Sequence, residues 1–455
     1  MSPAPLLDSG PRRRSLPAAA SSRPLGDYWR RPELFRRTLL GGVAAVIGFA
    51  VLAFGGVYGW VFGTAYSLLF LLLGAWTWQF GNGRLPLRRV RLYWPMVAFA
   101  GLCLWQYAFH QTPSRGDTLT EIMHLAAAGS LFFLVTQCVE PADSRWLLPA
   151  IALFTAAVGL MAVLQLLTGA KGIYWTYSFE NAASAGSYVD RDHFAGCMEL
   201  LLPMTFVQAV RRPSLSAALV WSLPVALGGA ALLLTASRGG AIAVTVQIVL
   251  GLLLWGYHRL RSETAQQVVR RSSSLTILIV VLVVAAYIGA VGFDRLGTRF
   301  SQLNNGSLAT DRRTYLNLSA ITMWDHKPIA GWGLNSWKSV YPNFAYFDDL
   351  ATYEFAHNDY LQLLAEDGLL GAFCTMGFGL LWLLALTRPL QRPVAEEASA
   401  WCVLGAAVGF AGMLVHTAVD FNLHIPANLL LFFFMAGLAL MRWLPEHTVF
   451  PEVTR

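Results

Sequence analysis

Two arginines and a histidine are the residues best suited to chemistry in this sequence, because each lies at the edge of a long apolar run. The segment YVDRDHFAG places Arg191 and His193 directly before such a run, where a helix would begin. A helix N-terminus favours anions, and an arginine guanidinium beside it adds a forked donor suited to phosphate. The same residues also fit a simple cluster in which Asp192 caps the helix and Arg191 pairs with Asp190. Spacing alone leaves both interpretations open.

The second arginine, Arg238, belongs to the segment TASRGGA (235–241). Gly239 and Gly240 permit the close approach of another backbone, which leaves the arginine side chain directed at whatever lies at that face. A snorkelling arginine on a tight turn explains the pattern equally well.

The histidine, His357, opens the segment HNDYLQLLAEDGLLG (357–371), which leads into an apolar run. An unperturbed imidazole has a pKa of about 6.5, so it can be a neutral base near pH 7. A helix beginning near Asn358 would carry Asp359, Gln362 and Glu366 on one face, and Gly368 would permit a bend before the span. A lone histidine at an interface is also often only a hydrogen-bonding residue.

The composition identifies the class of protein. Hydrophobic residues make up 56% of the 455 positions and charged residues 13%, and the mean hydropathy is +0.50. Soluble chains carry about 25% charged residues, and apolar runs of about 18 residues mark membrane spans. We therefore predict an all-α polytopic membrane protein. The net charge of +7 does not indicate nucleic-acid binding, because most arginines lie at the ends of apolar runs, as topology signals and phospholipid contacts do.

The apolar runs predict about twelve spans. They cover roughly residues 39–58, 62–80, 92–109, 120–138, 147–168, 194–210, 216–234, 240–257, 274–292, 369–387, 400–418 and 427–444. Residues 1–38 and 445–455 are predicted to be cytosolic tails, the first of them disordered. The segment 293–368 is predicted to be one large loop module with short helices.

The distribution of basic residues predicts the orientation. With the N-terminus in the cytosol, about 23 of the 33 Lys and Arg residues fall on the cytosolic side, as the positive-inside rule expects. Arg191, Arg238 and His357 then all fall on the outer side. So do Asp420 and His424, in the segment HTAVDFNLHIPA between the last two spans. Four distant pieces of sequence are thus predicted to place polar residues at one membrane face.

The loop module begins with a predicted amphipathic helix (310–328), capped by Thr310 or Asp311, followed by the glycine turn IAGWGLNSW (329–337). Many aromatic residues follow between 332 and 355, where they could stack on sugar rings or form an interfacial belt. The five cysteines lie in apolar segments without metal-site spacing, so we expect buried fillers and no metal site. No nucleotide-binding or dinucleotide signature is present, and no cofactor is expected.

Taken together, the segments DRDHFAG (190–196), TASRGG (235–240), PIAGWGLNSW (328–337) and HNDYLQLLAEDGLLG (357–371) resemble the hallmark segments of the O-antigen ligase and polymerase superfamily, in the same order. The commoner family form of the first segment has asparagines at the positions of Asp190 and Asp192. The resemblance implies a GT-C-like glycosyltransferase of the bacterial inner membrane, with its active site facing the periplasm.

Such enzymes transfer a glycan from undecaprenyl diphosphate to an acceptor hydroxyl, with inversion and without a metal or nucleotide. The resemblance implies that Arg191 and Arg238 hold the diphosphate and that His357 is the base. We predict that the polar neighbours complete the substrate-binding site; these are His193, Asp359, Asp420 and His424.

The acceptor is not determined by the sequence. A lipid A–core sugar, a carrier-linked repeat unit of an exopolysaccharide or O-antigen, and a protein hydroxyl all remain open, with a ligase-like activity slightly favoured. The alternative from another class is a transporter or lipid-linked sugar flippase, in which ionisable residues near mid-span and repeated halves are expected. Here the charges concentrate at one predicted face.

Overall fold

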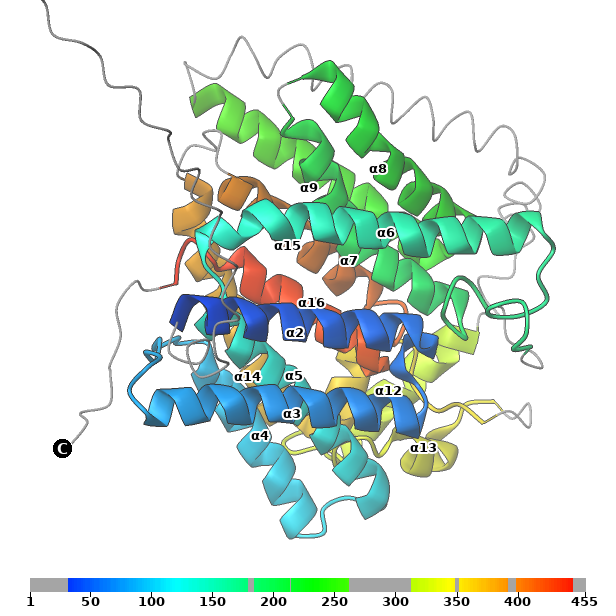
Figure 1. Ribbon diagram of the computed structural model, residues 1–455. Helices are drawn as coiled ribbons and strands as arrows, with labels where there is room; N and C mark the ends of the chain where they lie inside the picture. Colours follow the sequence, from blue (N-terminus) through cyan, green and yellow to red (C-terminus); the bar gives the residue numbers. More distant parts are fainter. Residues whose placement is uncertain are drawn as a thin grey trace, which may run out of the picture.

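The computed structural model describes residues 32–178, 184–212, 214–261, 312–347, 352–391 and 398–444 (Figure 1). Within these ranges the chain is helical, and β-structure is confined to the isolated bridges Ile173–Tyr177 and Ala185–Tyr188. The predicted all-α fold is therefore confirmed for the part of the chain described.

The helices follow one another as α2 (Pro32–Leu52), η1 (Phe54–Gly56), α3 (Gly59–Gly81), α4 (Tyr93–Ala108), α5 (Arg115–Cys138), η2 (Pro141–Asp143), α6 (Ser144–Leu167), α7 (Arg191–Val210), α8 (Leu215–Thr235), α9 (Arg238–Arg261), α12 (Arg312–His326), α13 (Trp337–Val340), η4 (Tyr341–Phe344), α14 (Asp359–Gln391), α15 (Ala398–His416), η5 (Asn422–His424) and α16 (Pro426–Ala439).

Eight helices among the described residues are long and apolar enough to cross a membrane, namely α2, α3, α5, α6, α7, α8, α14 and α15. The apolar part of α9 (Arg238–Leu254) and α16 are shorter, and α4 has 16 residues. These eleven helices coincide with the predicted spans except 274–292. Three predicted features lie outside the described residues. They are this span, both chain ends beyond residues 32 and 444, and the caps Thr310 and Asp311. The fold is that of a polytopic helical membrane protein, and the count of twelve spans stays a prediction.

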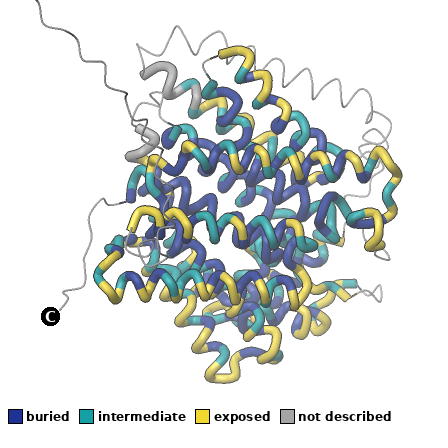
Figure 2. The backbone as a smooth tube through the Cα atoms, viewed as in Figure 1, coloured by how far each residue is buried: buried dark blue, intermediate teal, exposed yellow. Residues whose placement is uncertain are grey.

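Helices α7 and α15 form the centre of the bundle. Of their apolar segments 83% and 72% respectively are buried, compared with 22% for α14. Helix α7 packs against α6, α8 and α15, and Figure 2 shows the buried residues concentrated in the inner helices. The outer helices instead expose apolar side chains, such as Leu71 on α3 and Phe373 on α14. Such surfaces suit contact with lipid tails.

Helix α2 begins at Pro32, seven residues before the predicted span, because its first turn is held by a buried ion pair. The Arg36 guanidinium lies 2.5 Å from Asp143 Oδ2 and also donates to the carbonyl of Cys138. Phe35 and Leu39 are buried beside it. An arginine buried in an apolar bundle needs such partners. Residues 32–38, which were predicted to end the disordered tail, are therefore helical in the structure.

Helix α14 contains the bend that the sequence predicted at Gly368, which has φ 62° and ψ −160°. The glycine turn docks onto this break, where the N–H groups of Leu369 and Leu370 donate to the carbonyls of Pro328 and Ile329. A Cβ at Gly368 would overlap that backbone, so only glycine fits. The bend thus attaches the 328–337 segment to the start of α14.

The segment 312–365 has a small hydrophobic core of its own, built by α12, α13 and the first turns of α14. The aromatic residues of the loop mostly belong to it. Trp337 and Tyr341 are buried and stacked, with ring centroids 4.9 Å apart, and Tyr353 packs against the same core. These rings are therefore not available to stack on sugars, whereas Tyr346 is exposed.

The crossing of α6 and α8 requires glycine at position 159. A Cβ there would lie 2.9 Å from backbone atoms of Leu227 and Gly228. Small residues at such crossings let two membrane helices approach closely.

We expect Gly159→Ala to lower the melting temperature of the detergent-purified protein, because overpacking costs roughly 1–3 kcal/mol. Gly74→Ala in α3 is the matched control, since its added methyl would meet no atom within 4 Å. Thermal unfolding followed by intrinsic fluorescence measures both variants. Equal melting temperatures would contradict the close packing of α6 on α8.

Candidate active site

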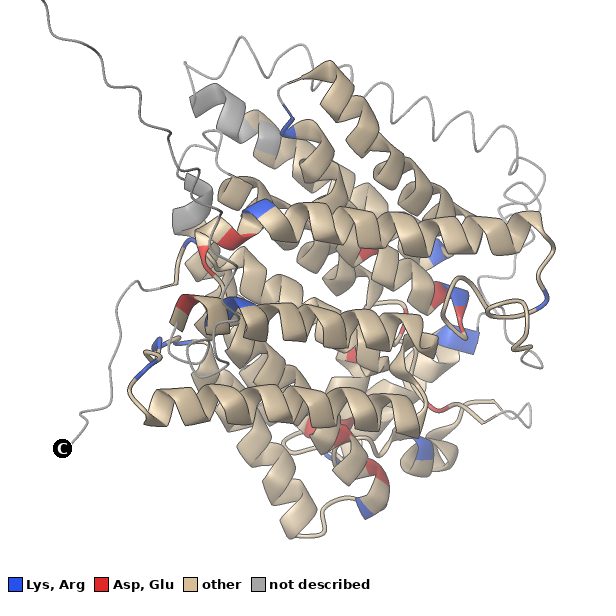
Figure 3. Ribbon diagram, viewed as in Figure 1, with Lys and Arg blue, Asp and Glu red and all other residues tan. Residues whose placement is uncertain are grey.

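The starts of α7, α9 and α14 meet the connection between α15 and α16 at one end of the bundle. Gly239 packs against His416, Gly196 packs against Asn422, and the Asp359 amide donates to the carbonyl of Thr417. Figure 3 shows that charged residues gather near helix ends and are sparse along the helices. Segments separated by more than 200 positions thereby contribute to one polar cluster.

His357 and Asp420 form the central contact of this cluster. His357 Nδ1 lies 3.2 Å from Asp420 Oδ1, and the Phe421 amide donates to the same oxygen at 2.9 Å. The Asp420 side chain is 3% exposed and that of His357 is 29% exposed. Among the described residues none is hydrogen-bonded to Nε2 of His357. With Nδ1–H donating to the carboxylate, the neutral tautomer presents the Nε2 lone pair outward, as a general base requires.

Asp420 is held as a carboxylate by its surroundings. Burial alone raises the pKa of Asp420. The hydrogen bond from His357 and the positive charges of His193 and Arg313 outweigh burial, so the pKa lies well below its usual range. The negative charge of Asp420 is therefore present throughout the physiological range, and it can stabilise a proton acquired by His357.

His357 is fixed on the backbone side as well. Its φ of 54° lies in the left-handed region, which non-glycine residues rarely occupy. Asn358 Oδ1 accepts a hydrogen bond from the Leu361 amide and so caps α14. The Phe421 ring lies edge-on to His357, with centroids 4.8 Å apart. The imidazole orientation is thus set from α14 and from the 417–425 connection together.

Arg191 is the first residue of α7, and its helix cap is Asp190. Asp190 Oδ1 accepts from the Asp192 amide at 2.7 Å, so Asp190, not Asp192, is the capping residue. Within the described residues no ion pair involves Arg191, so the pairing with Asp190 that the sequence left open is not formed. His193, two residues further along the helix, is 6% exposed and faces Phe421, with ring centroids 4.6 Å apart. His193 therefore packs inside the cluster and Arg191 stands at its rim.

Arg238 is the first residue of α9 and is exposed. The glycines after it allow the close approach expected from the sequence. A Cβ at Gly239 would overlap the His416 ring, and one at Gly240 would lie 3.1 Å from Ala195 Cβ and Glu199 Oε1. Arg238 therefore stands beside the first turns of α7, which begins with Arg191. The first turns of α7 and α9 thus lie in contact, and each helix begins with an arginine, an arrangement that favours binding of an anion.

Asp359 and His424 form a second, largely buried arm of the cluster. Asp359 Oδ2 accepts from the Leu423 amide at 3.2 Å. His424 lies between two carboxylates, with Nε2 3.5 Å from Asp359 and Nδ1 3.7 Å from Glu121 on α5. Phe355 stacks on the His424 ring at 4.6 Å. Because these groups are enclosed, they support the site and are less suited to direct contact with a large substrate.

The charge on His424 follows from these neighbours. Burial alone lowers the pKa of His424, but the carboxylates of Glu121, Asp359 and Glu366 raise it to about 9. The imidazolium is therefore the form present at neutral pH.

Several residues of the cluster were not assigned from the sequence. Neither His416 nor Arg313 received a role from the sequence, although the charge of Arg313 acts on Asp420. Glu199 is a lone carboxylate within the apolar α7, and such a residue is a signal that the sequence did contain. Among the residues described, no three His, Cys, Asp or Glu side chains are grouped so as to hold a metal ion.

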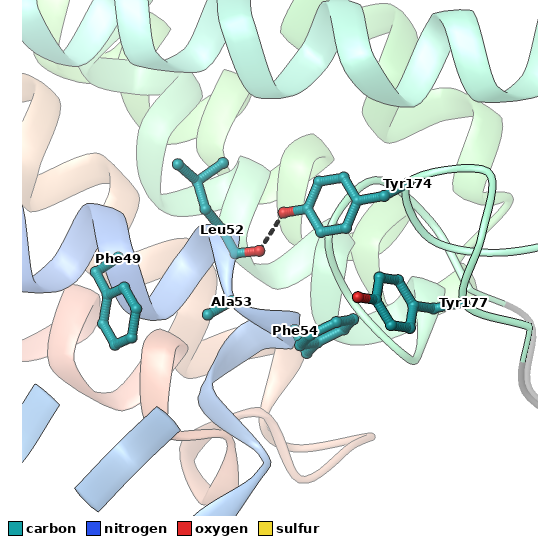
Figure 4. A pocket seen from close by; sticks show the side chains of 6 residues that line it. All are labelled: Phe49, Leu52, Ala53, Phe54, Tyr174 and Tyr177. Carbon is teal, nitrogen blue, oxygen red and sulfur yellow. Dashed lines mark hydrogen bonds between the residues drawn. The ribbon is translucent and has the colours of Figure 1, made fainter. Parts of the chain in front are cut away.

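An apolar pocket of about 330 Å³ lies where α2 ends (Figure 4). The Tyr174 hydroxyl donates to the carbonyl of Leu52 at its wall, and Phe54 lies edge-on to Tyr177 at 5.2 Å. None of its lining side chains carries a charge, so the pocket offers no group for acid–base chemistry. The lining residues are Phe49, Leu52, Ala53, Phe54, Tyr174 and Tyr177.

The fold and the polar cluster define a multi-pass helical membrane protein with its ionisable residues gathered where several helices begin. Residues 223–376 match the family model described as O-antigen ligase. This match supports the O-antigen ligase and polymerase superfamily, and with it a function of the O-antigen ligase or polymerase type. The matched segment contains Arg238 and His357 but neither Arg191 nor Asp420. No match was found among curated proteins.

We expect the stabilising effect of the buried His424 ion pairs to depend on pH. Because the pKa is raised from 6.5 to about 9 in the folded protein, the contribution is complete below pH 6.5 and is lost as the pH rises toward 9. The parent melting temperature should therefore fall more steeply between pH 6.5 and 9 than that of His424→Gln. The exposed His326 provides a control, His326→Gln, which should keep the parent slope. A His424→Gln slope equal to the parent slope would contradict the assignment.

Proposed function

We propose that this protein is a glycosyltransferase of the O-antigen ligase type, which transfers a glycan from undecaprenyl diphosphate to an acceptor hydroxyl at the periplasmic face of the bacterial inner membrane. The observation that carries the proposal is the contact between His357 Nδ1 and Asp420 Oδ1 at 3.2 Å, beside the two helix starts that bear Arg191 and Arg238. A base and an anion site at one place are what transfer from a diphosphate donor requires.

In the proposed reaction the acceptor oxygen forms a bond to the anomeric carbon while the bond from that carbon to the diphosphate oxygen breaks. The hydroxyl proton passes to His357 Nε2, and the electron pair leaves with the carrier diphosphate. Attack from the face opposite the leaving group inverts the configuration. Asp420 stabilises the imidazolium formed in this step, because its carboxylate accepts the Nδ1–H hydrogen bond.

Arg191 and Arg238 are proposed to neutralise the charge that develops on the leaving diphosphate. Guanidinium groups bind phosphate oxygens in a forked geometry, and the starts of α7 and α9 add amide donors. Two fixed cations of this kind can take the place of a metal ion, so the proposed reaction is metal-independent. The energy of the diphosphate linkage drives transfer without a nucleotide.

The acceptor that we propose is a sugar hydroxyl of the lipid A–core, with a carrier-linked repeat unit and a protein hydroxyl as the alternatives for the same chemistry. The match to the O-antigen ligase family model supports lipid-linked glycan and polysaccharide substrates in general. Tyr346 is exposed and His357 is half-buried, so both side chains are accessible from outside the fold. Supplying each acceptor class separately to the purified enzyme with a carrier-linked donor distinguishes the three activities.

We expect His357→Gln to lower kcat by roughly 10²–10⁴-fold with little change in KM for the donor, since a general base acts mainly in the transition state. The measurement is transfer of a labelled glycan from undecaprenyl diphosphate by the purified protein. His326→Gln, at an exposed position of α12, is the control and should retain parent activity. Full activity of His357→Gln would exclude His357 as the base. Movement of labelled carrier lipid across vesicles without glycan transfer would instead support a transporter.

We expect Arg191→Gln and Arg238→Gln each to lower kcat by roughly 10²–10³-fold, because each removes a donor to the leaving group. Arg115→Gln is the matched control, since Arg115 is also the first residue of a helix and is exposed. Addition of EDTA should leave parent activity unchanged. If both variants keep the parent rate, the proposed diphosphate site is wrong. A rate lost with EDTA and restored by Mg²⁺ would contradict the metal-independent reaction.

A further inference from the structure

Glu199 and His416 form a buried pair behind the proposed catalytic dyad. The two oxygens of Glu199 lie 2.9 and 3.1 Å from His416 Nδ1. The side chain of Glu199 is 0% exposed and that of His416 is 1% exposed. A carboxylate enclosed by an apolar bundle is strongly destabilising unless a cation compensates it. The position of His416 indicates that it supplies that charge as an imidazolium.

The second nitrogen of His416 is directed at the dyad. His416 Nε2 lies 3.9 Å from Asp420 Oδ2, while the other oxygen of Asp420 lies 3.2 Å from His357 Nδ1. His416 Nε2 is buried and has no hydrogen-bond partner among the described residues. An imidazolium in this place interacts with a carboxylate on each side, Glu199 through Nδ1 and Asp420 through Nε2.

Helix α9 closes this arrangement against water. Gly239 and Gly240 bring its first turn directly onto His416 and Glu199, where a Cβ at Gly239 would overlap the His416 ring. Gln247, two turns further along α9, donates to the main-chain carbonyl of Glu199 at 2.9 Å. The pair therefore interacts in a low-dielectric environment, where charge interactions are strong.

We propose that Glu199 and His416 are positioning residues that act through Asp420, with the His416 imidazolium bridging the two carboxylates and holding Asp420 in line with His357. This inference rests on the proposed function for its catalytic consequence, although its electrostatic consequence needs no substrate. The bridge limits the negative field that Asp420 exerts on His357. Only the neutral imidazole can accept the proton of the acceptor hydroxyl.

Other ionisable groups face the same place and contribute to its field. At the start of α7 they are the cap Asp190 and the helical residues Asp192 and His193, which interact electrostatically with one another or with His416. Arg313 on α12 and Asp359 on α14 interact with Asp420, and Arg238 precedes Gly239, which contacts His416. None of these groups changes in the variants below, so a difference between the parent and a variant reports the pair itself.

The test measures how fast diethyl pyrocarbonate modifies His357 in native membranes as a function of pH, with peptide-resolved mass spectrometry. The reagent reacts with the neutral imidazole, and His357 is accessible at 29% side-chain exposure whereas His416 is enclosed. In His416→Gln the cation beside Asp420 is removed. In Glu199→Gln the buried His416 loses the carboxylate that holds its proton and becomes neutral, so in both variants the uncompensated Asp420 carboxylate favours the protonated form of His357. We therefore expect the pH at which the modification rate of His357 is half its maximum, the modification midpoint, to move upward by about 0.5–1 pH unit in both variants.

Matched variants separate positioning from a general loss of structure. Thr205→Val removes a buried hydroxyl further along the same helix, which bonds to Thr155, and should leave the midpoint unchanged. Glu199→Asp keeps the charge and should shift the midpoint less than Glu199→Gln.

In the double variant Glu199→Gln/His416→Gln the shift should equal that of His416→Gln alone, because both residues act through one bridge. Work in native membranes allows variants that are unstable in detergent to be measured.

A midpoint unchanged in both Gln variants would overturn the inference, as would additive shifts in the double variant. In the transfer assay, the acid limb of the profile of kcat against pH should move in the same direction, and by the same number of pH units, as the modification midpoint. If the parent protein transfers no glycan, the proposed function is refuted. The modification midpoints would still test the bridge, because they need no substrate. Transfer by the parent with unmoved midpoints would refute the bridge alone.

Discussion

A carboxylate that is buried in an apolar bundle must have compensating charges, and Asp420 is the residue through which this requirement organises the site. Its oxygens lie near His357 on one side and His416 on the other, while Arg313 adds a positive charge at longer range. These partners come from α12, from the turn before α14 and from the end of α15, so compensating Asp420 requires the polar ends of these helices to meet. The need to compensate the charge of Asp420 therefore favours these helix ends as neighbours. The same contacts hold His357, the proposed base, beside Asp420.

Close packing makes this arrangement possible. Glycines at the starts of α7 and α9 let neighbouring groups approach to contact distance, as Gly196 does with Asn422 and Gly239 with His416. Asn428 then links the cluster to the first turn of α16, since its amide donates to Asn422 and to the carbonyl of His193. The contacts that pack these helices together are therefore also the contacts that position the reactive groups. A change that loosens the helices will therefore also loosen the site.

The loop module is connected to the reactive end through α14. The Glu366 carboxylate accepts from the amides of Asn335 and Trp337 at 2.9 and 2.8 Å, and Gly368 accommodates the glycine turn. The start of the same helix carries His357 and Asp359 into the cluster. One short helical stretch thus holds the module on one side and the imidazole on the other, so a partner bound by the module would be held at a fixed distance from the base.

The sequence by itself determined the class of fold, since apolar runs and arginine placement are local properties that a membrane requires of any spanning helix. It also indicated His357, Arg191, Arg238, Asp420 and the bend at Gly368, because each departs from the apolar pattern around it. Tertiary structure alone decided that Asp190 is the cap of α7, that α2 begins at Pro32, and that most loop aromatics form a core. It also decided that Glu199 and His416 meet behind Asp420. These outcomes depend on which helix lies beside which, and no local pattern encodes that choice: a histidine 217 positions from a glutamate becomes its partner only when the bundle has packed.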